Sequence, residues 1–347
     1  MLTSSKQIKK ENEYDIGLAI IRPILSFFVV MTHCYTFNYL QGKWRILYIN
    51  SGKLLFHVPT FFIIAFYFSY KTLISRNYKK KLERFQRLFI PYIFWPIIIC
   101  LLNRILIKFI RVKLQTSFQL LIHQLLFGNG YIDAFWFQWN LIIITLFYII
   151  IIRLFKKHYT FILIVFHIFA FNYQYNGKNL YFVKFQGVTG SNFGRLLEMI
   201  PYSIIGFLLS SSEIIKYLKK YRIKNILICI YFIYFLMNYK IFNEIKGFAY
   251  NGLKLYFLSI TIFFSFTMFP SENIKNQLII RIIKQITNHT AGVYFIHYNI
   301  YIYMKSYILN IKNKTIKGCI IIYLISYFIC FIGNLLFRNT KLRYLFI

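Results

Sequence analysis

Charged residues are scarce in this sequence, and acidic residues are the scarcest among them. Only 15% of the 347 residues are charged, compared with about 25% in a typical soluble domain, whereas 58% are hydrophobic and 21% are aromatic. Proline is also rare, with 6 residues, which excludes a collagen-like fibre. The high apolar content excludes a disordered chain and an ordinary soluble enzyme. The composition is therefore typical of a polytopic membrane protein.

The few cysteines show no metal-binding pattern. Cys34, Cys100, Cys229 and Cys330 lie inside apolar runs and Cys319 lies at the edge of one, without a spacing such as C-x2-C. Small buried hydrophobic residues are the simplest interpretation of this pattern. We expect no bound metal.

The charge balance is strongly basic, with 42 Lys and Arg against 9 Asp and Glu and a formal net charge of +33. Such an excess raises the question of nucleic-acid binding. The basic residues here stand in short clusters between apolar runs, where they act as topology signals and contact anionic lipid head groups. We therefore expect membrane lipids as partners and no nucleic acid.

Apolar runs recur along the whole chain and predict an all-α, polytopic membrane helical bundle with about ten transmembrane helices. A single integral-membrane domain is expected over 1–347, because no linker or repeat interrupts the pattern. The predicted spans are about 16–36, 54–70, 88–107, 135–152, 159–173, 196–211, 225–239, 251–269, 290–309 and 318–337.

The distribution of Lys and Arg predicts that both termini are cytoplasmic. With this orientation, the inside loops hold more basic residues than the outside loops, mainly because of the loop over 71–87. The first apolar run contains Arg22 and is followed by no small-residue cleavage site, so we expect it to remain as a membrane anchor.

Arg22 and His33 are the most informative ionisable residues within a predicted span. A central Arg costs about 2.5–3.5 kcal/mol on insertion scales and tends to face the interior of the bundle or a water-filled cavity. The two residues are 11 positions apart, which is about three helical turns, so both project from one face. Two interpretations remain open here: a shared polar path, or snorkelling of Arg22 with His33 at the outer interface.

Arg84 and Arg87 lie at i and i+3 in the segment that leads into the third predicted span. Two guanidinium groups on one helix face form a clamp suited to phosphate. The alternative is positive-inside anchoring.

His57, His297 and Trp136 are candidates for contacting a substrate. Each lies near the end of a predicted span. For the histidines the alternative is a structural role at the interface, and for Trp136 it is membership of the aromatic belt.

Taken together and in order, these residues resemble the acyltransferase-3 family of bacterial integral-membrane acyltransferases. The most specific match is an R-x10-H pattern in the first helix, formed by Arg22 and His33. Further matches are Val58-Pro59-Thr60-Phe61-Phe62, the pair Arg84 and Arg87 followed by Pro91-Tyr92, Trp136-Phe137, Gly206-Phe207 and Tyr294-Phe295-Ile296-His297. The resemblance covers nearly the whole chain. It departs from the family at Ala19, where members often have Asp, and at Pro23, where a small residue is usual.

The resemblance implies transfer of an acyl group, commonly acetyl, from a cytoplasmic acyl-CoA to a hydroxyl of a surface polysaccharide or its lipid-linked precursor. It also implies a multi-pass protein of the bacterial inner membrane. Arg84 and Arg87 would hold the phosphates of acetyl-CoA or another acyl-CoA, with Arg22 further along the path. His33 would carry the chemical step, because an imidazole titrates near working pH. It would serve as general base or accept the acyl group itself.

Two other classes compete with an acyltransferase. A transporter or flippase for lipid-linked oligosaccharides also combines many helices with buried charge, but internal repeats or Gly/Pro-broken helices are expected there and are not evident. A polysaccharide polymerase usually has a large extracytoplasmic loop, whereas the longest loop predicted here is short.

Overall fold

The computed structural model describes residues 15–33, 55–107, 117–128, 135–176, 188–238, 252–270, 274, 276–310 and 316–347. The protein is all-helical over these residues, and no strand occurs among them. The α-helices are α1 Ile16–His33, α3 His57–Ile74, α4 Tyr78–Leu106, α5 Phe118–Phe127, α6 Trp136–Phe155, α7 Tyr159–Asn176, α8 Val188–Ser211, α9 Ile214–Lys220, α10 Arg222–Asn238, α11 Leu253–Thr267, α12 Gln277–Asn288, α13 Thr290–Asn310 and α14 Ile316–Phe337. Two 3-10 helices, η3 Lys156–His158 and η6 Lys341–Leu345, complete the set.

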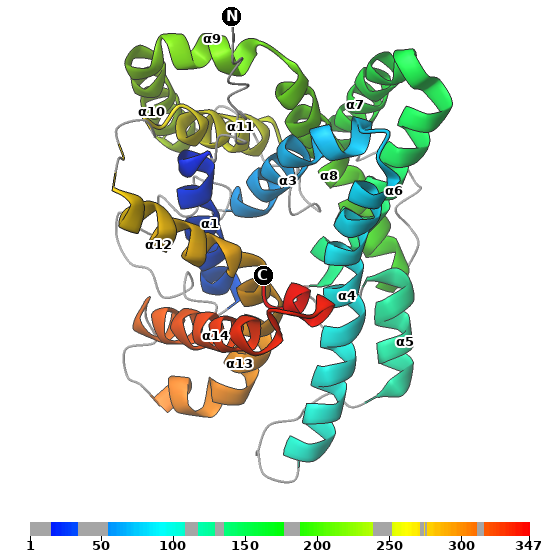
Figure 1. Ribbon diagram of the computed structural model, residues 1–347, viewed down its shortest axis with the longest axis vertical. Helices are drawn as coiled ribbons and strands as arrows, with labels where there is room; N and C mark the ends of the chain where they lie inside the picture. The colour runs from blue at the N-terminus through cyan, green and yellow to red at the C-terminus, as the bar shows by residue number, and fades with distance from the viewer. Residues whose placement is uncertain are drawn as a thin grey trace, which may run out of the picture.

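Helix α1 packs mainly against the last four α-helices of the chain. Helix α1 contacts α3, but also α11, α12, α13 and α14, and it lies near the centre of the bundle in Figure 1. On one side of it stands α4, with α5 and α6 packed beside it (Figure 1). Residues of α1 are therefore brought next to residues about 270 positions away, as in the hydrogen bond from Thr287 Oγ1 to the Ala19 carbonyl at 2.7 Å.

Helices α3 and α8 make the most extensive contact among the described helices. A Cβ added at Gly206 of α8 would overlap the backbone of Ile63 in α3, so only glycine permits this approach. Aromatic rings fill the space around it: the Tyr148 ring lies 5.0 Å from Phe66 and 4.7 Å from Phe207 between centroids. We call this contact the aromatic seam, made by Ile63, Phe66, Tyr148, Gly206 and Phe207.

Each of the ten predicted apolar runs contains a helix, so the all-helical prediction is confirmed over the described residues. Residues 34–36, 54, 239 and 251 of the predicted spans lie outside the described residues. Among the described helices, four are long and apolar enough to cross a membrane: Ile16–His33, Tyr78–Leu106, Trp136–Asn172 and Lys317–Phe337. The full count of ten spans and the cytoplasmic placement of both termini stay predictions.

Helix α4 begins ten residues earlier than the predicted span at 88. The side chain of Asn77 accepts a hydrogen bond from the Lys80 amide at 3.3 Å and caps the helix. Arg84 and Arg87 consequently belong to the same continuous helix as the predicted span, on one helix face as expected for an i, i+3 pair.

Helix α12 lies in a region expected to be a loop between two spans. Asn276 caps it by accepting a hydrogen bond from the Leu278 amide at 2.9 Å. Leu278, Ile279 and Ile282 remain exposed on its surface together with the basic Arg281. A search for long apolar runs misses such a helix because its apolar residues occupy only one face.

The segment after α14 folds back into the bundle. The Trp95 indole donates a hydrogen bond to the Leu345 carbonyl at 3.0 Å, and His289 Nδ1 donates one to the Phe346 carbonyl at 2.9 Å. Helix η6 thereby bridges α14 and α4 (Figure 1). This docking brings Ile347 to the wall of the cavity described next.

Candidate active site

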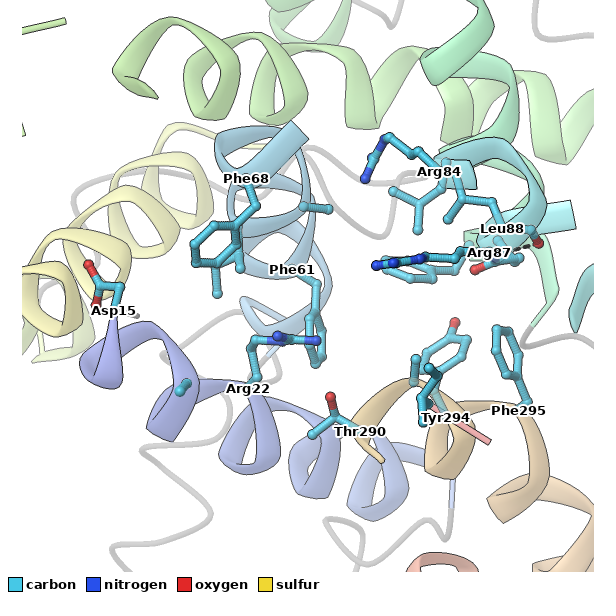
Figure 2. A pocket seen from close by; sticks show the side chains of 18 residues that line it. Asp15, Arg22, Phe61, Phe68, Arg84, Arg87, Leu88, Thr290, Tyr294 and Phe295 are labelled. Carbon is cyan, nitrogen blue, oxygen red and sulfur yellow. Dashed lines mark hydrogen bonds between the residues drawn. The ribbon is translucent and has the colours of Figure 1, made fainter. Parts of the chain in front are cut away.

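A cavity of about 530 Å³ lies between α1, α3, α4, α6 and α13. Its volume is in the range of small-molecule and cofactor sites, roughly 300–1,000 Å³. Arg22, Arg84 and Arg87 all line it, although Arg22 is far from the other two in sequence. Figure 2 shows Arg22 of α1 and Arg84 of α4 pointing into the same space from opposite walls. We call this space, with its three guanidinium groups, the cationic cavity.

Two of the three guanidinium nitrogens of Arg84 are buried. Its Nε and one terminal nitrogen are shielded from solvent and have no hydrogen-bond partner among the described residues. The guanidinium lies 5.9 Å from the centroid of the Phe66 ring, at the limit of a cation–π contact. Leaving charged donors buried and unsatisfied costs free energy. Such a group is stabilised when an anion enters the cavity.

Arg87 lies at the more open part of the same wall. Arg87 is exposed overall, and its guanidinium lies 5.5 Å from the centroid of the Tyr344 ring. Arg84 and Arg87 are one helical turn apart, so their guanidinium groups act on one volume. The i, i+3 pair predicted from the sequence does line a common cavity with Arg22.

The carboxyl group of Asp15 lies at the end of the cavity nearest the start of α1 (Figure 2). Burial raises the pKa of Asp15 above its ordinary value, although the Leu18 amide and Lys219 act in the opposite direction. Lys219 Nζ lies 3.5 Å from Asp15 Oδ2. Since Lys219 already pairs with this carboxyl, Asp15 offsets little of the positive charge of the arginines.

Much of the remaining wall is apolar and aromatic. Phe61 of α3, Phe137 of α6, and Tyr294 and Phe295 of α13 line the cavity. Figure 2 shows Tyr294 and Phe295 on the side away from Asp15. The cavity thus combines a cationic part that suits an anion with a ring-lined part that suits an extended, weakly polar chain.

The two predicted histidines of α1 and α13 contact one another. The ring centroids of His33 and His297 are 5.1 Å apart, and the Tyr298 ring contacts His33 at 5.5 Å. His33 is absent from the described residues that line the cavity, but Tyr294, which does line it, has its ring 5.9 Å from His297. The histidine pair therefore lies behind the aromatic end of the cavity.

His57 and Trp136 are not among the described residues that line the cavity. His57 is buried, with its ring 6.4 Å from Phe56. Trp136 is also buried, and the guanidinium of Arg195 lies 5.0 Å from its ring. Of the predicted site residues, the structure thus brings together three arginines at one place and two histidines beside it.

Two residues of the cavity wall, Gln138 and Ile347, were not predicted from the sequence. Gln138 lines the wall and is held by a hydrogen bond from its Nε2 to the Leu88 carbonyl at 2.8 Å. Ile347 reaches the wall only because the segment after α14 folds back. The signal for the latter was the apolar and aromatic sequence Tyr344-Leu345-Phe346-Ile347.

Over the ranges that the structure describes, no group of three His, Cys, Asp or Glu side chains could hold a metal ion. Cys100, Cys229 and Cys330 carry free thiols, Cys319 is buried in α14, and Cys34 lies outside the described residues.

Comparison with known proteins places this geometry in a family context. The family model described as an acyltransferase domain, acyltransferase-3, matches residues 15–338. No significant match was found among curated proteins or among solved structures. The matched range contains the three cavity arginines and both histidines of the pair. Since the match spans nearly the whole chain, this protein belongs to the acyltransferase-3 family.

Proposed function

We propose that this protein transfers an acyl group, with acetyl as the expected group, from acyl-CoA to a hydroxyl of a surface polysaccharide or its lipid-linked precursor at the bacterial inner membrane. The observation that carries the proposal is the cationic cavity. Three guanidinium groups line it. The guanidinium of Arg84 has two buried nitrogens without a partner among the described residues. A thioester donor whose carrier bears several phosphates would supply the anionic hydrogen-bond acceptors that these guanidinium groups lack.

The shape of the cavity supports one orientation of the donor. The diphosphate and phosphate groups would contact Arg22, Arg84 and Arg87, since guanidinium groups bind phosphate through paired, charge-assisted hydrogen bonds. The apolar arm would run past Phe137 and Tyr294, which line the same cavity. The thioester would then approach the histidine pair behind Tyr294.

His33 would perform the chemical step. As a neutral imidazole, it would take the proton of the attacking hydroxyl while the oxygen attacks the thioester carbonyl. The C–S bond then breaks, and the leaving thiolate recovers the proton as the CoA thiol. The alternative is attack by His33 itself to form a transient acyl-imidazole, which the hydroxyl then cleaves. Both routes require one unprotonated ring nitrogen on His33.

Donor binding gives the most direct test of the proposal. The full chain is purified into lipid nanodiscs, and binding of radiolabelled acetyl-CoA is measured by equilibrium dialysis. Replacing Arg84→Gln and Arg87→Gln together should raise the Kd about 100-fold, because charge-assisted hydrogen bonds are lost. The matched control is Lys79→Gln with Lys80→Gln, which makes the same change in charge at exposed positions of the same helix. It should change the Kd by less than about twofold.

Turnover is measured as release of CoA thiol in the presence of membranes that carry the acceptor glycan. His33→Ala should lower this release about 1,000-fold, to a small but measurable rate, and leave donor binding unchanged. Equal effects of the two double variants on the Kd would contradict the assignment of the cationic cavity. Tight binding of acetyl-CoA without any thiol release by the unaltered protein would instead favour a transporter.

A further inference from the structure

His297 has a fixed tautomer in this structure. Its Nδ1 lies 3.1 Å from the Val293 carbonyl oxygen, one turn earlier in α13. A carbonyl oxygen can only accept a hydrogen bond, so Nδ1 carries the hydrogen. A neutral imidazole then has its lone pair on Nε2. The second nitrogen of His297 is therefore a hydrogen-bond acceptor.

This acceptor is buried and unused. His297 has no exposed surface, and its Nε2 has no hydrogen-bond partner within the part of the chain that the structure describes. An unsatisfied polar atom in the interior costs free energy and is uncommon in native proteins. The unpaired Nε2 of His297 therefore favours a hydrogen-bond donor beside it.

His33 is the nearest ring that can supply a donor. The two imidazoles lie 5.1 Å apart between centroids with an interplanar angle of 53°, and Tyr298 packs against His33 at 5.5 Å. The contact joins α1 to α13, two helices that pack directly together. His297 and Tyr298 are consecutive residues, so one segment of α13 contacts His33 through two rings.

We infer that His297 is a positioning residue for His33: its Nε2 accepts the N–H of His33 during turnover and so leaves the other ring nitrogen of His33 unprotonated for the reaction. This inference rests on the proposed function. The same arrangement, a base oriented by a third group, is used by many acyl-transfer sites. It assigns to His297 a task distinct from contact with the substrate.

The proton balance of the step is complete with these two residues. The hydroxyl proton moves to the free nitrogen of His33 as the C–O bond forms and the C–S bond breaks. The resulting imidazolium keeps its hydrogen bond to His297 Nε2, which stabilises the positive charge. The thiolate of the leaving carrier then takes the proton back from His33. His297 stays neutral and keeps its bond to Val293 throughout.

Two substitutions of His297 test the roles of its two ring nitrogens separately. Asn places an amide near the position of Nδ1 and retains the bond to Val293, but offers nothing at the position of Nε2. Gln extends further and can place a carbonyl oxygen near the position of Nε2. His297→Asn should lower kcat about 100-fold with KM for acetyl-CoA unchanged, and His297→Gln should recover at least tenfold of that loss.

The matched control is His289→Asn. His289 is another buried histidine whose Nδ1 donates to a backbone carbonyl, that of Phe346, and its ring contacts Tyr327 at 5.4 Å. This control should keep kcat within about threefold of the unaltered protein. Thermal midpoints in nanodiscs report whether each variant folds.

A double variant completes the test. If His297 acts through His33, then His33→Ala combined with His297→Asn should be no slower than His33→Ala alone, because the second change removes nothing further. Multiplied losses, equal effects of Asn and Gln, or a rise in KM at unchanged kcat would overturn the inference. An inactive His33→Ala beside a fully active His297→Asn would overturn the inference and leave the proposed function intact. An active His33→Ala would refute the role of His33 itself.

Discussion

The two faces of α3 have opposite character. One face packs into the aromatic seam, where Gly206 lets the backbone of α8 reach Ile63 and the rings of Phe66, Tyr148 and Phe207 fill the remaining space. The other face lines the cationic cavity, where Arg84 keeps nitrogens buried without a partner among the described residues. The seam is closed by contacts within the chain, whereas in the cavity two buried nitrogens of Arg84 have no partner among the described residues and would be satisfied by the proposed donor. A disruptive substitution in the seam should therefore lower the stability of the protein. Removal of the buried charge in the cavity should raise the stability of the ligand-free protein but weaken donor binding.

The largest effect on stability is expected in the aromatic seam. Gly206→Val would introduce a side chain onto the backbone of Ile63 and should destabilise the protein by about 3 kcal/mol, the upper end for overpacking. The measurement is the thermal midpoint in nanodiscs. Gly194→Ala in the same helix is the control, because a Cβ there meets no atom within 4 Å. A midpoint that is unchanged by Gly206→Val would show that the seam is not closed at this position.

An effect of opposite sign is expected in the cationic cavity. Arg84→Met replaces a buried charge with an apolar side chain of similar length and should stabilise the ligand-free protein by about 1 kcal/mol. If acetyl-CoA is the donor, as proposed, it should raise the thermal midpoint of the unaltered protein, and Arg84→Met should abolish this gain, since the anion loses a partner. Destabilisation of the ligand-free protein by Arg84→Met would mean that Arg84 supports the fold rather than the ligand.

The smallest effect is expected at Asp15, at the margin of the cavity. Burial raises the pKa of this carboxyl in the folded state above its ordinary value of 3.8. The folded state therefore binds the proton more tightly than the unfolded state, so the stability that it contributes is present below pH 3.8 and is lost as the pH rises through the raised pKa.

Asp15→Asn removes this titration. The thermal midpoint of the unaltered protein should fall relative to that of the Asn variant as the pH rises from about 4 to about 7. The opposite slope would show that the pair with Lys219 outweighs burial.

The sequence predicted the elements of the fold better than their lengths. Each of the ten predicted apolar runs contains a helix among the described residues, because the search for long apolar runs detects continuous apolar helices. The start of α4 at Tyr78 was missed, since its first turns are charged and only the cap at Asn77 marks them. Helix α12 was missed for a related reason, because its apolar residues occupy one face.

Three of the residues that line the cavity, Arg22, Arg84 and Arg87, were candidates from the sequence, but local patterns could not derive their arrangement around one space. The spacing of Arg84 and Arg87 fixed their shared face, since helical geometry is local. The convergence of Arg22 on the same cavity depends on the packing of α1, which no local pattern encodes. The contact of His33 with His297 joins residues 264 positions apart and likewise follows from the packing of α1 against α13.

A pocket that gathers guanidinium groups will also collect small inorganic anions from its surroundings. Phosphate or sulfate in a purification buffer would occupy the neighbourhood of Arg84 and raise the melting temperature in proportion to the logarithm of its concentration. The same ions would compete with the donor and weaken its apparent affinity. Chloride salts with a zwitterionic buffer are therefore the appropriate medium for kinetic work on this enzyme, and added phosphate is a simple reporter of an intact pocket.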